Sequence, residues 1–361
     1  MKKLIALLLA VMMVVGLAAC AQPAAQQTQG ETTKLYIPVM AKGFQHQFWQ
    51  AVKAGADAAA KDLGVEIYFD GPASETEIDA QVNMVKQELA KNPQAMALAA
   101  LSTEAVTEIL EECAQKGIPV IGFDSGVPGD TTGAVKATAC TNNEAAAAIA
   151  AEKFGEHEGL VAAMKAATPD AKVRIGCLSQ DAVSASVTGR TTGFVNKMKE
   201  IASQYGTVAV VGHDLWAEGD AAAASIIIDV QVSATTEATA LQTASNTLLA
   251  NEDLIAVFCS NEGAVTGFLS AVEDGQALAE GGKYYGLVVA GFDAGAAQKN
   301  AVRQGWFYGS VTQDPYHIGY YAVEMAVAAA RGETVADKDT GAQWYNAENI
   351  DDEMIAMLVY D

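Results

Sequence analysis

The sequence predicts an α/β protein whose strands form parallel sheets. Short runs rich in β-branched and apolar residues alternate with helix-length amphipathic segments almost from one end of the chain to the other. This alternation implies βαβ crossovers, which cover both faces of a parallel sheet with helices. The segment from Lys34 to Asp361 is long enough for two lobes with separate cores. Ligands of such sheets bind beyond the carboxyl ends of the strands, so the residues after each strand are the candidate site.

The predicted strands are short, and helical periodicity separates several of them. We expect strands at residues 35–39, 65–69, 95–100, 119–123, 173–178, 208–211, 254–259, 287–290 and 307–312. Apolar residues recur at helical spacing from Phe48 to Leu63, and Gly64 follows, so we expect a helix that ends there. The same periodicity predicts a helix over residues 77–91.

The first twenty residues have the order of an export signal. A pair of lysines precedes an apolar run that ends at Leu17, and this run is shorter than the about 20 residues that a transmembrane helix needs. The quartet Leu17-Ala18-Ala19-Cys20 looks like a bacterial lipobox. We therefore expect residues 1–19 to be a signal peptide and Cys20 to carry a diacylglycerol. A plain secretory peptide with an incidental cysteine is the alternative.

The segment that follows the lipobox is predicted to be a tether. Residues 21–33 contain no large apolar side chain, so they cannot bury enough surface to fold. With the lipidated Cys20, residues 20–33 would form a flexible link that reaches on the order of 20 Å. Such a link lets a folded body stand clear of a membrane.

The charge of the chain excludes some partners. The sequence has 44 acidic and 22 basic residues, and loss of Lys2 and Lys3 with the signal leaves 44 against 20, a net charge of −24. Nucleic-acid binding needs basic patches, so no nucleic-acid partner is expected. The same charge disfavours contact with anionic lipid, so the membrane would be reached only through the lipid anchor.

The sequence has no local motif for catalysis, a cofactor or a metal. It lacks the glycine-rich dinucleotide and phosphate loops and the G-x-S-x-G nucleophile elbow. The four histidines are scattered and form no zinc pattern, and the four cysteines after Cys20 are expected to be free thiols. We expect no cofactor, no metal and no enzymatic activity, although a triad assembled from distant residues stays open.

Polar and aromatic side chains follow the predicted strands in a combination that suits a polyhydroxylated ring. A sugar has apolar C–H faces and a rim of hydroxyls, so its site needs flat aromatic surfaces together with carboxylate, amide and guanidinium groups. The candidate residues are Phe48, Trp49, Asp124, Arg190, Trp216, Asn261, Asp293 and Gln313. Core packing is the alternative role for the first two aromatics.

The order of these motifs resembles that of the pentose and hexose binding proteins of the type I periplasmic-binding family, relatives of the ribose and galactose/glucose receptors. The pieces GIPVIGFD, GRTTGF, FCSNEG, VVAGFD and SVTQDPYHIG occur in the order typical of that family. The resemblance covers the chain from about Lys34 to its C-terminus.

The resemblance implies a role for each candidate residue. Phe48 and Trp49 match the aromatic pair that stacks on the sugar, and Trp216 matches the opposing aromatic wall. Arg190 matches the guanidinium that holds ring and hydroxyl oxygens, and Asp124 matches the carboxylate that ends the fourth strand. The C-lobe amide, its neighbouring carboxylate and the hinge-side amide correspond to Asn261, Asp293 and Gln313.

Two departures limit the choice of sugar. Ser125 occupies the place where ribose binders carry an arginine, which argues against ribose. Trp216 favours the galactose/glucose branch, yet the calcium-loop sequence that this branch often carries is absent.

The resemblance implies two doubly wound parallel-sheet lobes joined by a three-crossover hinge. The N-terminal lobe would comprise residues 34–141 and 314–342, and the C-terminal lobe residues 142–313 and 343–361. The crossovers would fall near Asn142, Gln313 and Gly341, where turn-forming or polar residues interrupt the pattern.

The resemblance also implies a function. The chain would be a monomeric extracytoplasmic lipoprotein on the cell membrane that captures a monosaccharide between its lobes and passes it to the permease and ATPase subunits of an ABC importer. A receptor of the same fold for a cyclic polyol or a furanosyl signal molecule is the first alternative. An extracytoplasmic hydrolase is the second.

Overall fold

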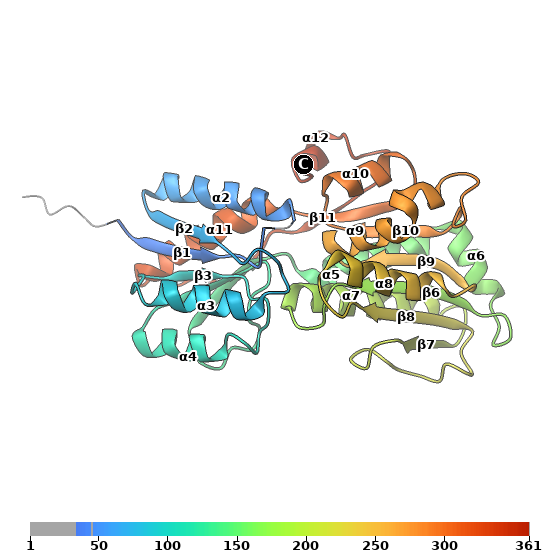
Figure 1. Ribbon diagram of the computed structural model, residues 1–361, viewed down its shortest axis with the longest axis horizontal. Helices are drawn as coiled ribbons and strands as arrows, with labels where there is room; N and C mark the ends of the chain where they lie inside the picture. The colour runs from blue at the N-terminus through green and yellow to red at the C-terminus, as the bar shows by residue number, and fades with distance from the viewer. Residues whose placement is uncertain (1–33, 45, 361) are drawn as a thin grey trace, which may run out of the picture. The chain divides into compact units, whose positions relative to one another are not determined.

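The computed structural model describes residues 34–44 and 46–360, and the chain from Leu35 onward forms one compact unit. The predicted signal peptide at residues 1–19 and the predicted anchor and tether at residues 20–33 lie outside the described residues. Figure 1 shows strands and helices that alternate along the described chain.

The first sheet has six strands in the order β12-β5-β4-β3-β1-β2, and all its neighbouring strands are parallel. Its strands are β1 (Tyr36–Met40), β2 (Glu66–Asp70), β3 (Met96–Leu98), β4 (Val120–Phe123), β5 (Val135–Cys140) and β12 (Lys338–Asp339). Helices cover both of its faces. The helices α2 (Phe48–Leu63) and α11 (Pro315–Ala330) contribute to one core cluster, and α3 (Ile78–Leu89) and α4 (Thr107–Lys116) contribute to the other.

The second sheet has seven strands in the order β13-β11-β10-β9-β6-β8-β7. Its strands are β6 (Val173–Ser179), β7 (Val208–Val211), β8 (Ile226–Val232), β9 (Leu254–Cys259), β10 (Val288–Phe292), β11 (Gly309–Gln313) and β13 (Ala342–Tyr345). All neighbours are parallel except β11 and β13, which are antiparallel.

Helices also cover both faces of the second sheet. One core cluster contains residues of α5 (Asn143–Glu156), α6 (Glu158–Ala166) and α7 (Ala185–Ala202). The other contains residues of α8 (Ala238–Leu249), α9 (Glu262–Ala271), the short helix Glu273–Leu278, α10 (Ala296–Arg303) and α12 (Glu353–Ala356). Two parallel-sheet α/β layers with helices on both faces confirm the fold class that the alternating pattern predicts.

The chain passes between the two sheets three times: between β5 and α5, between β11 and α11, and between β12 and β13. Two of these passages lie side by side and are hydrogen-bonded to each other. The hydroxyl of Thr141 donates to the carbonyl oxygen of Gly341 at 3.2 Å, and the backbone N–H of Asn142 donates to Asp339 Oδ1 at 3.0 Å.

The helix α2 shows how local sequence determines where a helix begins and ends. Its observed bounds, Phe48 and Leu63, are those that the apolar spacing predicts. Gly64 ends it with φ of 67°, a left-handed conformation that glycine adopts without a Cβ clash. The buried face of α2 places Phe48 and Trp49 at its first turn, which follows β1.

Candidate functional site

A small cavity of about 20 Å³ lies where residues that follow strands of both sheets meet. Its lining residues are Lys42, His46, Phe48, Trp49, Glu75, Asp124, Val187, Arg190, Asn261, Glu262, Asp293 and Gln313. The first six belong to segments around the first sheet, and the last six to segments around the second. A volume of this size has room for about one water molecule, because charged side chains from both sides fill the space.

Seven of the eight residues selected from the sequence line this cavity. They are Phe48, Trp49, Asp124, Arg190, Asn261, Asp293 and Gln313. They are separated by as many as 265 positions in the sequence, yet the crossovers bring them together. All seven are buried, so their polar groups must bind each other or a ligand.

The structure does not bring Trp216 together with the other seven selected residues, because Trp216 does not line this cavity. Its indole Nε1 donates a hydrogen bond to the Thr192 hydroxyl at 2.9 Å, and its ring packs in the core cluster beneath α5 and α7. The physical reason is the position of β7, which is the edge strand of the second sheet. The segment after an edge strand lies far from the centre of the sheet, where the other site residues converge.

Arg190 lies at the centre of the charged groups. Its Nη1 lies 3.2 Å from Asp293 Oδ2, and its Nη2 lies 3.9 Å from Asp124 Oδ1, so it pairs with a carboxylate on each side of the cavity. Its Nε donates to Asn143 Oδ1 at 2.8 Å, and its guanidinium carbon lies 3.9 Å from the centroid of the Phe292 ring. Ion pairs, a hydrogen bond and cation–π stacking together fix the orientation of this side chain.

The backbone of Asp293 adopts a left-handed conformation that is unfavourable for a residue with a side chain. Its φ is 76°, in the left-handed region that few non-glycine residues adopt, and such strain is often found at binding sites. Its carbonyl oxygen accepts hydrogen bonds from the hydroxyls of Tyr345 and Ser310. Its carboxylate accepts from Gln313 Nε2 at 2.7 Å and from the backbone N–H of Glu262 at 3.1 Å. These contacts aim the carboxylate at the cavity.

Lys42 and Glu75 are two site residues that the sequence reasoning missed. Lys42 Nζ lies 3.6 Å from Asp124 Oδ2 and 3.8 Å from Glu75 Oε2, and it donates to the Ser186 hydroxyl at 3.3 Å. Glu75 accepts from Trp49 Nε1 at 3.0 Å and from Gln180 Nε2 at 2.8 Å. Since Lys42 follows β1 and Glu75 follows β2, the rule that selected the other residues could have found both.

The pKa values of the two carboxyl groups beside Lys42 are shifted in opposite directions. Burial tends to raise the pKa of Glu75, but Lys42, His46 and the donors Trp49 and Gln180 outweigh it and lower this pKa to about 2. Burial raises the pKa of Asp124, and the nearby Lys42 and Arg190 offset that only in part. The difference has a geometric cause, because hydrogen bonds reach Glu75, whereas Asp124 Oδ2 has no hydrogen-bond partner among the described residues.

The aromatic pair and Asn261 have structural roles as well as a place in the cavity wall. Phe48 and Trp49 pack edge to face, with ring centroids 5.0 Å apart, and Trp49 also packs against Phe123 of β4. Asn261 caps α9, because its Oδ1 accepts from the backbone N–H of Ala264 at 2.9 Å. Core packing, the alternative role for Phe48 and Trp49, therefore accounts for part of their contacts.

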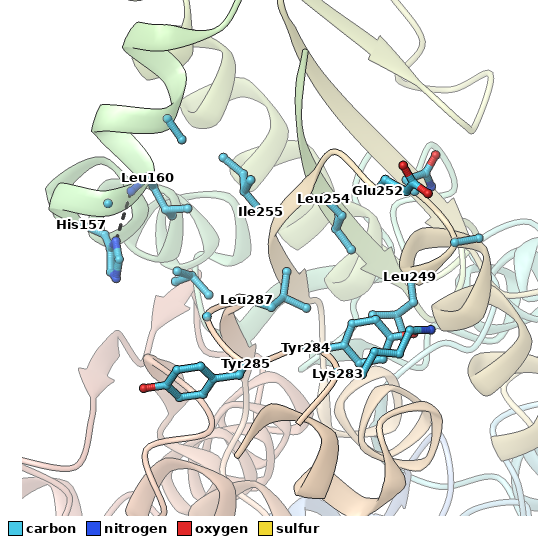
Figure 2. Close-up of a pocket in the computed structure, with 16 residues that line it drawn as sticks. His157, Leu160, Leu249, Glu252, Leu254, Ile255, Lys283, Tyr284, Tyr285 and Leu287 are labelled. Atoms are coloured by element: carbon cyan, nitrogen blue, oxygen red, sulfur yellow. Dashed lines mark hydrogen bonds between the residues drawn. The ribbon is translucent and has the colours of Figure 1, made fainter. Parts of the chain in front are cut away.

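A much larger hollow, about 740 Å³, lies elsewhere on the second sheet (Figure 2). It is lined by residues of α6, by the end of α8 and by the segments that lead into β9 and β10. Leu160, Leu254 and Leu287 contribute apolar side chains, and Tyr285 is exposed at its edge. It lies at the amino ends of the strands, whereas ligands of parallel sheets bind beyond the carboxyl ends.

The remaining groups give no sign of metal or thiol chemistry in the described part of the chain. No cluster of histidine, cysteine and acidic side chains suited to a metal ion occurs there. The four cysteines are free, and burial raises the pKa of Cys113 to about 11 and that of Cys140 to about 12. Within the same residues, no helix has the length and apolar character needed to cross a membrane.

Two parallel-sheet lobes around a buried polar cavity define a class of ligand-binding protein, and comparison with known families identifies which one. The model of the periplasmic binding protein domain matches residues 37–334. This chain belongs to that family, which confirms the resemblance seen in the sequence motifs. Membership implies an extracytoplasmic location.

Solved structures and a characterised protein resemble the chain over most of its length. A protein of Brachyspira murdochii, described as an ABC transporter, LacI family transcriptional regulator, is 40% identical, and the match covers 91% of this chain and 99% of that one, with a TM-score of 0.76. A carbohydrate transporter solute-binding protein of Agrobacterium radiobacter, solved with D-arabinose, is 26% identical, with 91% and 100% covered and a TM-score of 0.73. The D-allose-binding periplasmic protein of Escherichia coli K12 is 25% identical over 320 residues, with 86% of this chain and 90% of that protein covered.

Proposed function

We propose that this chain is the solute-binding protein of an ABC importer and that it binds a monosaccharide in the cavity between its lobes. The observation that carries the proposal is the convergence of Arg190, Asp293, Asp124 and Lys42 from segments far apart in the chain. The relatives that bind D-arabinose and D-allose support a sugar as the ligand.

The chemistry of the cavity suits hydroxyl groups. Among the described residues that line it, three buried oxygens have no hydrogen-bond partner: Asp124 Oδ2, Glu262 Oε2 and Gln313 Oε1. A sugar hydroxyl donates one hydrogen bond and accepts others, so it can satisfy such an acceptor and at the same time accept from Arg190 or Lys42. Phe48 would cover an apolar face of the ring.

Binding requires the lobes to separate. A cavity of about 20 Å³ holds about one water molecule, so a sugar enters only when the two sides move apart and the charged side chains rearrange. Hinge closure around a ligand is a known motion, for which periplasmic binding proteins are a standard example. The proposed lobes comprise residues 34–141 with 314–342, and residues 142–313 with 343–361. Their division is supported by the three passages of the chain between the sheets.

The proposal includes an anchor and transport partners. The lipobox-like quartet that ends at Cys20 supports a lipid anchor that holds the protein at the outer side of the cell membrane. The partners would be the permease and ATPase subunits, which the transporter relatives support. We propose that the chain acts as a monomer and that it does not catalyse a reaction.

Calorimetry of the full chain tests the central proposal. We expect micromolar or tighter binding of at least one sugar from a panel of D-allose, D-arabinose, D-fucose, D-galactose and D-ribose, and loss of that binding in Asp293→Ala. If none of these sugars bound and the cyclic polyol myo-inositol did, the alternative receptor would replace the sugar receptor. Turnover of a sugar conjugate that was lost in Asp293→Ala would instead support a hydrolase.

A further inference from the structure

The first turn of α2 contacts the first turn of α10 at the rim of the cavity. The backbone N–H of Ala296, the first residue of α10, donates to Gln47 Oε1 at 2.9 Å. The N-cap residue of α10 is Gly295, which has no side chain to accept this bond. The free N–H groups of a helix start need acceptors, so a residue of one lobe here caps a helix of the other.

A contact in the opposite direction lies beside the first one. The N-cap residue of α2, Gln47, makes no side-chain capping bond, and the first turn of α2 has no acidic residue. The carboxylate of Glu262, which begins α9, interacts with the backbone N–H groups of Gln47 and Phe48. A carboxylate is favourable at a helix N-terminus, so the second lobe supplies to α2 what its own sequence lacks.

Tyr360 joins the same region from the C-terminal segment. Its hydroxyl accepts a hydrogen bond from the backbone N–H of Ala294 at 3.2 Å, next to Asp293. Its ring packs edge to face on Phe48, with centroids 6.3 Å apart, and it contacts the cores of both lobes. One side chain therefore links an aromatic wall of the cavity to the turn that carries its central carboxylate.

Gly295 shows how closely the two sides approach. A Cβ atom at this position would lie 2.5 Å from Glu262 Oε1 and 3.3 Å from Gln47 Oε1. The first distance is shorter than a normal contact, so a side chain at this position would displace the Glu262 carboxylate from its present place. We call the contacts of Gln47, Glu262, Gly295 and Tyr360 the closure seam.

We infer that Gln47 and Tyr360 are positioning residues that set the affinity for the ligand by holding the lobes together, without touching the ligand. The inference rests on the proposed function. Neither residue lines the cavity. The hydrogen bond of Gln47 with Ala296 and the packing of the Tyr360 ring on Phe48 join opposite lobes, so these two contacts exist only when the lobes are closed. Contacts found in one of two states shift the population of that state. Apparent affinity scales with the population of the binding-competent state, so every ligand is affected by the same factor.

The substitution Gln47→Ala, compared with Gln50→Ala, tests the inference. Gln50 lies on the same helix, is exposed and has no role in the seam, so it is the matched control. The loss of one hydrogen bond predicts that Gln47→Ala raises Kd about two- to tenfold, equally for two sugars of the panel, whereas Gln50→Ala leaves Kd unchanged. Tyr360→Leu removes the ring contact with Phe48 of the other lobe and should weaken binding in the same uniform way, whereas Tyr360→Phe loses only the hydroxyl bond to Ala294 within its own lobe and should leave Kd unchanged.

Two results would overturn the inference. One is a Kd for Gln47→Ala equal to that of Gln50→Ala, and the other is a change in the ratio of the two sugar affinities, which would mean direct contact with the ligand. Small-angle scattering of the ligand-free proteins gives a readout that needs no sugar. A larger mean radius of gyration for Gln47→Ala than for Gln50→Ala supports the seam even if no sugar of the panel binds, and an equal radius opposes it.

Discussion

The strands β9 and β10 have a hollow at each end, and the two hollows differ in nearly every respect. Beyond their carboxyl ends lies the cavity of about 20 Å³, lined by buried charges that include Arg190 and Asp293. At their amino ends lies the open hollow of about 740 Å³, with leucine and tyrosine side chains (Figure 2). Polar groups at the amino ends are satisfied locally, since Asn251 Nδ2 donates to Thr247 O and Leu248 O. Convergent buried charge, and not volume, distinguishes the proposed binding site.

Removal of Arg190 should give the largest effect. Arg190→Ala leaves the carboxylates of Asp293 and Asp124 without their shared cation, so we expect sugar binding to fall by a factor of about 30 or more. The free energy of unfolding should also fall by about 3 kcal/mol, because an unpaired buried charge remains. Calorimetry and urea unfolding measure the two effects.

Arg174→Ala is the matched control at the amino ends of the strands. Arg174 lies on β6 and pairs with Asp229 at 2.7 Å and with Asp253 at 2.9 Å, so its loss removes a comparable set of ion pairs. It should lower stability without changing Kd. Equal losses of sugar binding in the two variants would remove the distinction between the ends of the sheet.

Low pH should reduce the free energy of unfolding, because Glu75 becomes protonated. Its pKa is lowered from 4.5 to about 2 in the folded chain, so the unfolded chain binds the proton more readily. The stabilisation is therefore present above about pH 4.5 and is lost as the pH falls toward 2. Glu75→Gln should have a smaller decrease in the free energy of unfolding over this window, and at pH 7 it should be destabilised by about 1 to 3 kcal/mol.

Urea unfolding between pH 7 and pH 3 measures how the free energy of unfolding changes with pH. Glu108 is an exposed glutamate of the same lobe, and Glu108→Gln should follow the wild type at every pH. If the free energy of unfolding of Glu75→Gln changed with pH as much as that of the wild type, other carboxyl groups would be responsible for the loss of stability in acid.

A comparison of Trp49, which lines the cavity, with Trp216, which packs in a core cluster, tests which tryptophan contacts the ligand. Trp49→Phe should weaken sugar binding several-fold and remove most of the change in tryptophan emission, because Trp49 lines the cavity and donates to Glu75. Trp216→Phe should leave Kd within about twofold, since it loses only a bond to Thr192 away from the cavity. The opposite order of effects in a fluorescence titration would restore Trp216 to the cavity wall.

The smallest effect is expected in the large hollow. Tyr285 is 66% exposed there, so Tyr285→Ala should change the free energy of unfolding by no more than about 0.5 kcal/mol and leave sugar binding unchanged. Calorimetry checks this result. Weakened binding in Tyr285→Ala would show that the two ends of the sheet are coupled.

Much of the local structure follows from the sequence alone. The bounds of α2, β7 and β9 agree with the predicted ones, because apolar periodicity and glycine stops act over a few residues. The strand β8 was missed, although its sequence IIIDVQV is strongly apolar. A short apolar run cannot be assigned to a strand or a buried helix by periodicity, and only its pairing with β6 and β7 decides the matter.

The candidate site, too, has features that follow from the sequence and features that only the tertiary structure decides. The sequence by itself determined which polar residues follow strands, and this rule located Asp124, Asn261 and Asp293, because parallel strands bring their carboxyl ends to one edge. The order of the strands in the sheet decided that Trp216, which follows an edge strand, belongs to the core. The contact of Lys42 with Ser186 and the contact of Gln47 with Ala296 join residues more than a hundred positions apart. Such contacts form only when both lobes are folded and meet, and no local pattern in the chain encodes their distances.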